Sequence, residues 1–165
     1  MRGDLLDEET ETALDTYRSG EFPPDYIPSP RQRMSIHKRM ASIDTEDQRM
    51  KLREEIEDLY GKLPTRAELL FTNLYLKELA RKSRIDHIRV RSEGAKLRLN
   101  EKATQEFSPE LVVKLDRAYP GKVRLAVKGR IYLEIKPPEK EDLWEPILME
   151  ILGVLRQEDS PSSRS

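Results

Sequence analysis

The spacing of apolar residues changes near Ser83, and this change constrains the fold more than any other feature of the sequence. Before it, apolar side chains recur every three or four residues, as they do on the buried side of a helix. After it, Ile88 and Val90 alternate with Arg89 and Arg91, which is the period of a strand. The chain is therefore expected to join a helical half to a β-rich half.

Cap and turn residues predict where the helices begin and end. Ser29 followed by Pro30 is typical of an N-cap and a first helical turn, and Asp44 or Thr45 suits the cap of a second helix. Gly61 stands where a left-handed residue ends that helix. The elements expected in this half are a strand over 12–17, an extended proline-rich arm over 22–30, and helices over 30–42, 45–60 and 65–84.

Apolar side chains give these helices their expected buried sides. Leucines and aromatic residues between 69 and 79 cover more than one side of the third helix, which predicts a central helix with several neighbours. The first two helices each carry one apolar stripe. The residues expected to face inward from them are Met34, Ile36, Met40, Ile43, Met50, Leu52, Ile56, Leu59 and Tyr60.

The carboxyl-terminal half is predicted to run β-β-α-β-β and to end in a helix. The break at Ser92–Gly94 makes the first strand pair a hairpin, and Gly129 separates a second alternating pair. A helix opened by Ser108 lies between the pairs, and a last helix over 140–156 holds Pro146 in its first turn. We expect an α+β fold in which the helical amino-terminal half packs on a small, mainly antiparallel sheet.

The length of 165 residues suits one domain. We expect residues 11–156 to form it, between a disordered linker at 1–10 and a disordered polar tail at 157–165. The sequence has no cysteine and no apolar run near the roughly 20 residues of a membrane-spanning helix. We therefore expect a cytoplasmic protein without disulfides or a membrane segment.

The motifs that build common catalytic centres are missing from the sequence. It contains no GxxxxGK[ST] or GxGxxG loop, no GxSxG elbow and no HExxH helix. The two histidines, His37 and His87, are 50 residues apart, and neither has a partner at metal-ligand spacing. We expect no catalytic residue, metal or cofactor in this chain.

Two charged sets leave alternatives open. Glu54, Glu57 and Asp58 would share one side of a helix, either as solvated surface or as a face for a basic partner. The basic residues from Arg81 to Arg98 form either the wet side of a hairpin or a phosphate-binding surface. The formal net charge of −1 and the absence of aromatic residues between 80 and 106 favour the first reading of the basic set.

The stretch between 25 and 64 carries two ordered motifs. The first is Asp25-Tyr26-Ile27-Pro28, followed after four positions by Arg33-Met34 and then by His37-Lys38-Arg39-Met40-Ala41-Ser42; the second is Glu54-Glu55-Ile56-Glu57-Asp58-Leu59-Tyr60-Gly61-Lys62-Leu63-Pro64. Their order resembles the opening of the C-terminal domain of bacterial transcription-repair coupling factors, whose second element is E-L-x-D-R-F-G-x-L-P. The similarity extends over residues 11–135. His37 replaces the tyrosine usual in that family, and Leu59 replaces the arginine of D-R-F-G.

The resemblance implies a regulatory domain of a larger bacterial protein. Members of that family are ATP-dependent DNA translocases that displace stalled RNA polymerase from double-stranded DNA and recruit UvrA through a UvrB-like module. ATP and magnesium belong to their motor domains. The C-terminal domain is implied to pack on the UvrB-like module of the same chain, hiding the UvrA-binding surface.

The resemblance also suggests roles for individual residues. We expect Glu54, Glu55, Glu57 and Asp58 to contact arginines of the UvrB-like module. The other motif residues are expected to hold the arm and the helices together; they are Asp25, Tyr26, Pro28, Arg33, Arg39, Tyr60, Gly61 and Pro64. The alternative is a nucleic-acid-binding module that uses the basic hairpin 81–98.

Overall fold

The computed structural model describes residues 12–159, with side chains up to Arg156. The chain forms two compact units. The helical unit is Arg18–Glu78, and the sheet unit joins the residues up to Tyr17 to those from Leu79 onward. That 11–156 act as one domain stays a prediction. The predicted linker 1–10 and most of the predicted tail, 160–165, lie outside the described residues.

The helical unit contains the three predicted helices. They are α2 (Pro30–Ala41), α3 (Glu46–Tyr60) and α4 (Thr65–Lys82), whose residues up to Glu78 belong to this unit. Ser29 caps α2 as predicted, since its hydroxyl accepts a hydrogen bond from the backbone N–H of Gln32 at 3.2 Å. Pro30 then occupies the first turn, where a missing N–H costs nothing.

The proline-rich arm contributes directly to the core of the helical unit. Phe22 is 3% exposed and Ile27 is fully buried. Just before the arm, at Gly20, the chain passes so close to α4 that an added Cβ would lie 2.8 Å from the carbonyl oxygen of Arg66. The buried core consists of Phe22, Ile27, Ile36, Met40, Leu52, Ile56, Leu63, Ala67, Phe71 and Leu74.

Three residues predicted to face inward are exposed instead. Met34, Met50 and Leu59 are 62%, 54% and 71% exposed. The buried stripe of α3 is narrow, centred on Leu52 and Ile56, and long polar side chains fill its flanks. A stripe of this width leaves apolar residues at its edges in contact with water.

The sheet unit is built on a five-stranded sheet of order β1-β2-β3-β5-β4. β1 pairs with β2 in parallel, and all other pairs are antiparallel, as the mainly antiparallel prediction requires. The strands are β1 (Ala13–Thr16), β2 (Ile85–Arg91), β3 (Gly94–Leu99), β4 (Val123–Lys128) and β5 (Arg130–Ile135). β3 and β5 lie side by side, which joins the two predicted strand pairs into one surface.

The helices of the sheet unit include one that the sequence pattern did not predict. This helix, α5 (Glu101–Gln105), begins at Asn100, whose side chain accepts from the N–H of Ala103 at 2.8 Å. The predicted helices are α6 (Pro109–Ala118) and α7 (Trp144–Asp159), with a short 3-10 turn, η1 (Glu141–Leu143), before α7. The last helix thus starts later than position 140, and it includes 157–159, which were assigned to the tail.

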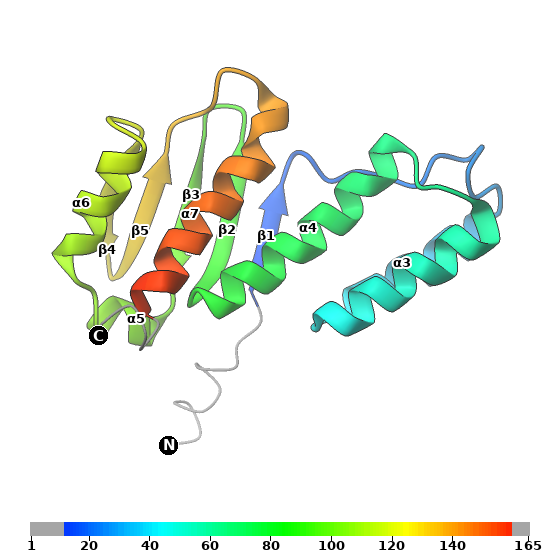
Figure 1. The fold of residues 1–165 in the computed structure, drawn as a ribbon, viewed down its shortest axis with the longest axis horizontal. Helices are drawn as coiled ribbons and strands as arrows, with labels where there is room; N and C mark the ends of the chain where they lie inside the picture. Colours follow the sequence, from blue (N-terminus) through cyan, green and yellow to red (C-terminus); the bar gives the residue numbers. More distant parts are fainter. Residues whose placement is uncertain (1–11, 160–165) are drawn as a thin grey trace. The chain divides into compact units, whose positions relative to one another are not determined.

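Helices α6 and α7 lie on one side of the sheet (Figure 1). Strand alternation turns Ile88, Leu97 and Leu133 toward that side, and all three are fully buried. The residues that alternate with these along each strand point to the opposite side of the sheet, which we call the open face. No helix among the described residues is long and apolar enough to cross a membrane.

Candidate protein-interaction surface

Helix α3 carries the acidic residues singled out in the sequence, and its start is fixed by local chemistry. Thr45 and Gln48 form a capping box, in which the Thr45 hydroxyl accepts from the N–H of Gln48 at 3.1 Å and the Gln48 side chain accepts from the N–H of Thr45 at 3.3 Å. Glu46 and Asp47 place negative charge in the first turn, where the helix dipole favours it. Of the two predicted caps, Thr45 is the one used.

Ion pairs hold both flanks of α3 against α4. Arg49 donates to Glu78 at 2.6 Å and lies over the ring of Tyr75 at 4.9 Å. Arg53 donates to both carboxylate oxygens of Glu68, at 2.8 and 2.6 Å. The hydrogen bond to Glu68 raises the pKa of Arg53. These bridges fix which side of α3 remains in solvent.

The four acidic residues predicted to dock a partner differ in their surroundings. Arg39 donates to both carboxylate oxygens of Glu55, at 2.5 and 3.0 Å, and this hydrogen bonding lowers the pKa of Glu55. Glu57 is half-buried and accepts from the backbone N–H of Leu63 at 3.2 Å. Glu54 and Asp58 are exposed, and neither pairs with another described residue. We call these four residues the acidic ridge.

Two tyrosines of the motifs hold the turn that follows α3. The hydroxyl of Tyr26 donates to the carbonyl oxygen of Gly61 at 2.6 Å. The hydroxyl of Tyr60 donates to the side chain of Gln32 at 2.7 Å, and the centroids of the two tyrosine rings are 5.8 Å apart. Burial raises the pKa of Tyr26. The arm, α2 and the end of α3 therefore meet at this turn.

Gly61 and Pro64 shape the same turn through their backbones. Gly61 has φ 90° and ψ −174°, a conformation open essentially to glycine alone, and its N–H donates to the carbonyl of Glu57 at 2.9 Å. The carbonyl of Pro64 accepts from the N–H groups of Ala67 and Glu68 at 2.9 and 3.0 Å. Pro64 thus supplies the first hydrogen bonds of α4.

The remaining motif residues belong mostly to the arm. Arg33 donates to the carbonyl oxygens of Ile27 and Pro28, at 2.6 and 3.2 Å, which ties α2 back to the arm. Pro28 is exposed apart from this contact, and Asp25 is exposed without a hydrogen bond to another described residue. Arg39 joins α2 to α3 through Glu55.

Sequence reasoning missed two features of this surface. It assigned Met50 and Leu59 to the core, whereas both lie exposed on α3 together with the acidic ridge. It also missed the buried bridge between Arg49 and Glu78, which are 29 residues apart. The arginine would have been a usable signal, since a charged residue at the edge of an apolar stripe requires a partner.

The basic residues of the hairpin do not act as one set. Arg84 pairs with Glu106 at 2.8 Å, Arg91 pairs with Asp15 at 2.8 Å, and Arg98 donates to the buried Asp86 at 2.6 Å. Strands β2 and β3 also lie in the middle of the sheet, so their open face continues onto β5 and β4. The predicted hairpin surface is therefore only part of a wider one.

Taken together, these observations define a mixed α/β fold that contains a helical unit with a charged surface and a unit built on a mainly antiparallel sheet. Residues 19–109 match the family model of the TRCF domain. The chain belongs to this family, that of transcription-repair coupling factors.

Relatives and a solved structure agree with the family. The chain is 28% identical over 149 residues to the transcription-repair-coupling factor of Bacillus subtilis, covering 90% of this chain and 13% of that protein. It is 30% identical over 122 residues to that of Escherichia coli, covering 74% of this chain and 10% of that protein. The chain thus spans little more than a tenth of the length of these relatives.

The fold is that of a known domain. The crystal structure of the C-terminal domain of transcription-repair coupling factor superposes with a TM-score of 0.69 at 21% identity. The match covers 92% of this chain and 97% of that domain. This chain accordingly has the fold of that C-terminal domain.

Proposed function

We propose that this domain is an autoinhibitory element of a DNA-repair protein. It docks on a UvrB-like module of the same parent chain, through the acidic ridge, and masks the surface that binds UvrA. The parent is an ATP-dependent DNA translocase that acts on stalled RNA polymerase, with nucleotide and magnesium bound in its motor domains. The domain itself regulates and performs no chemistry.

The observation that carries the proposal is the free carboxylate surface of α3. Glu54 and Asp58 are four residues apart, exposed, and without partners among the described residues. Like charges at this spacing repel by a few tenths of a kcal/mol, which a basic partner would relieve. Exposed Met50 and Leu59 add apolar area on the same helix. A carboxylate pair next to apolar side chains suits an arginine-bearing protein surface.

The other two ridge residues have secondary roles in this proposal. Glu57 already satisfies the N–H of Leu63 and is committed to the turn. Glu55 is held by Arg39, so its use by a partner requires exchange of one arginine for another. A module linked in the same chain is present at high effective concentration, so the contact needs little intrinsic affinity to form. A contact of low intrinsic affinity can also open when another partner competes for it.

The test uses the full 165-residue chain and the isolated UvrB-like module of the parent. Titration calorimetry should show at least a tenfold loss of affinity for Glu54→Lys/Asp58→Lys, since two attractive contacts become repulsive. The matched control is Glu139→Lys/Asp142→Lys, which makes the same charge change at exposed positions outside α3. Circular dichroism should show that both variants remain folded.

A second measurement addresses masking. Wild-type domain added to the UvrB-like module should reduce its binding of UvrA, and the ridge variant should not. Equal binding of the ridge variant and the wild type would reject the ridge as the docking surface. Undiminished UvrA binding in the presence of saturating wild-type domain would reject masking.

A further inference from the structure

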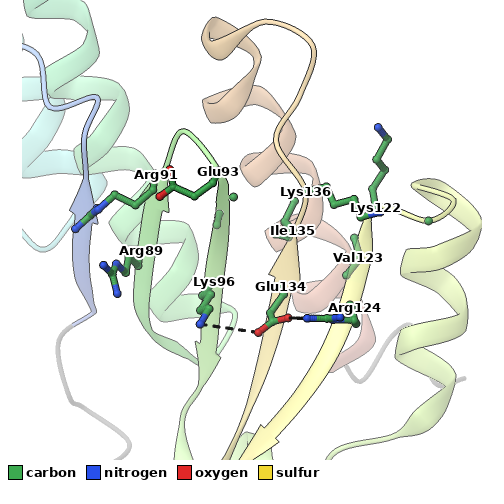
Figure 2. Close-up of a pocket in the computed structure, with 13 residues that line it drawn as sticks. Arg89, Arg91, Glu93, Lys96, Lys122, Val123, Arg124, Glu134, Ile135 and Lys136 are labelled. Carbon is green, nitrogen blue, oxygen red and sulfur yellow. Dashed lines mark hydrogen bonds and ion pairs between the residues drawn. The ribbon is translucent and has the colours of Figure 1, made fainter.

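The strand register places a row of charged residues across the whole open face of the sheet. Asp15, Arg89, Lys96, Glu134 and Arg124 are direct partners on β1, β2, β3, β5 and β4. Figure 2 shows Lys96, Glu134 and Arg124 side by side across three of these strands. Because cross-strand partners point to the same side, this row is a property of the pairing and not of one flexible loop.

Further cations follow at the two-residue period of the strands. Arg98 is the register partner of His87 and Tyr132 in the next row, and Lys128 and Lys136 continue the open side of β4 and β5. Two basins of about 810 Å³ and about 260 Å³ are lined by residues of this side, and the larger one also reaches Val123 and Ile135 at the ends of β4 and β5 (Figure 2). We call Arg89, Lys96, Arg98, Arg124, Lys128 and Lys136 the basic face.

Much of this positive charge is not used inside the protein. The side chains of Arg89, Lys128 and Lys136 make no hydrogen bond or ion pair with any other described residue. Glu134 receives Arg124 at 2.6 Å and Lys96 at 3.9 Å, so one carboxylate serves two cations. The basic face therefore has an excess of positive charge that only an outside anion would balance.

We propose that the basic face binds the phosphate backbone of double-stranded nucleic acid without sequence preference. Lysines and arginines on β2, β3 and β4, with Lys136 directly after β5, suit a repeating array of phosphates. Neighbouring strands are about 4.8 Å apart, and residues two positions apart along a strand are about 7 Å apart. The cations therefore repeat at regular intervals, which suits the regularly spaced phosphates of a polyanion.

Two absences on the open face select this ligand. Tyr132 is the one aromatic residue that the described strands place there, whereas single-strand binders stack successive bases on several aromatic side chains. The described strands also place no large aliphatic side chain on this face, whereas a protein interface normally has an apolar or aromatic anchor at its centre. Phosphates of a duplex need neither.

This proposal is independent of the proposed regulatory function. It uses the sheet unit, whereas the acidic ridge belongs to the helical unit, so each can fail alone. It also differs from a site confined to the hairpin 81–98, because Arg124, Lys128 and Lys136 come from β4 and the end of β5.

The main experiment measures binding of the full 165-residue chain to a fluorescent 20-base-pair DNA duplex by anisotropy in about 50 mM salt. Arg89→Glu/Lys128→Glu should weaken binding at least tenfold, as expected when two phosphate contacts are reversed. The control Arg117→Glu/Lys140→Glu carries the same charge change on α6 and before η1, and should stay within about threefold of the wild type.

A gain-of-affinity variant guards against misfolding as an explanation. Glu134→Gln removes the carboxylate that holds Arg124 and Lys96, so duplex binding should tighten about threefold and its salt dependence should steepen. An unfolded variant would not bind more tightly.

Three results would overturn the proposal. They are no wild-type binding to the duplex in low salt, tighter binding to a single strand of the same sequence, and equal or tighter binding to poly-glutamate, which would identify the partner as an acidic protein. An equal loss of duplex affinity in the Arg117/Lys140 control would also reject the basic face, because the loss would then follow from the change in net charge and not from its position.

Discussion

The helical unit and the sheet unit specify their structures in different ways. In the helical unit, side chains bond to particular backbone atoms, as Tyr26 does to Gly61 and Arg33 does to Ile27. Within the sheet, strands pair through their backbones, and most strand side chains alternate between apolar and polar. Directional contacts demand particular residues, whereas alternation accepts many.

This difference explains where the sequence resemblance is most specific. The two motifs lie between 25 and 64, entirely within the helical unit. The family model covers 19–109 and ends at the first residue of α6, before β4 and β5, although the fold match covers 92% of the chain. A sheet keeps its fold while its residues change, provided the alternation remains.

The two proposed binding surfaces differ in charge as well. The helical unit exposes free carboxylates at Glu54 and Asp58, and the sheet unit exposes free cations at Arg89, Lys128 and Lys136. A negatively charged surface favours a basic partner, and a positively charged surface favours an acidic one. The two proposals above therefore assign one partner to each unit.

Glu78 in the helical unit and Asp86 in the sheet unit are buried carboxylates whose arginine partners should respond most strongly to mutation. Glu78 is 5% exposed and pairs with Arg49, whereas Asp86 is 8% exposed and pairs with both Arg98 and Arg130. Arg49→Met should cost about 3 to 5 kcal/mol, because Glu78 is left buried without its cation. Arg98→Met should cost about 1 to 2 kcal/mol, because Arg130 remains.

Urea unfolding at neutral pH, followed by far-ultraviolet circular dichroism, measures both losses. The difference between the two losses in unfolding free energy is the informative quantity, since both variants replace an arginine with a methionine. Equal losses would show that the second arginine does not protect Asp86, and the comparison of the two units would fail at this point.

The same substitution at two glycines should have opposite effects in the two units. Gly61→Ala should cost about 1 to 3 kcal/mol, because φ 90° with ψ −174° is strained for any side chain, although nothing lies within 4 Å of the added Cβ. Gly153→Ala, in α7, should stabilise by about 0.5 to 1 kcal/mol, because alanine is the better helix former and the space is open. Thermal unfolding measures both; a shift of the same sign would contradict the conformational argument.

The smallest expected effect concerns exposed ion pairs, one in each unit. Hydrogen bonds from Arg39 and Arg91 lower the pKa values of Glu55 and Asp15 below their ordinary 4.5 and 3.8. A carboxyl group with a lowered folded pKa stabilises the fold above its unfolded pKa, and this contribution is lost as the pH falls through the folded value. Both pairs are exposed, so the change in stability should be small.

Carboxyl titration by nuclear magnetic resonance tests this directly. Arg39→Gln should return the pKa of Glu55 toward 4.5 and leave that of Asp15 unchanged. Added salt should reduce both shifts. An unchanged Glu55 pKa in the variant would show that Arg39 is not the cause.

Much of the fold was predictable because its signals are local. Ser29, Thr45 and Gly61 mark helix ends through bonds to residues a few positions away, and the predicted helices and strand pairs are present. α5 was missed because five residues are too few to show a helical period. Met50 and Leu59 were misplaced because periodicity gives the side of a helix but not the width of its contact.

The candidate surfaces were less predictable than the fold. The sequence grouped Glu54, Glu55, Glu57 and Asp58 by spacing, but long-range partners such as Arg39 decide which of them is free. That distinction depends on how α2 lies against α3, which spacing within one helix does not contain. Knowing which of the four acidic residues are free makes the docking site testable by mutation.

By itself, the sequence determined the periods of the elements, their caps and turns, and the motifs that place the chain in its family, because each depends on residues close together in the chain. Only the tertiary structure decided that β3 pairs with β5 and that cations from β2, β3, β4 and the residue after β5 form one face. The physical reason is that strand pairing joins segments far apart in sequence, and any alternating strand satisfies the pattern of several possible neighbours.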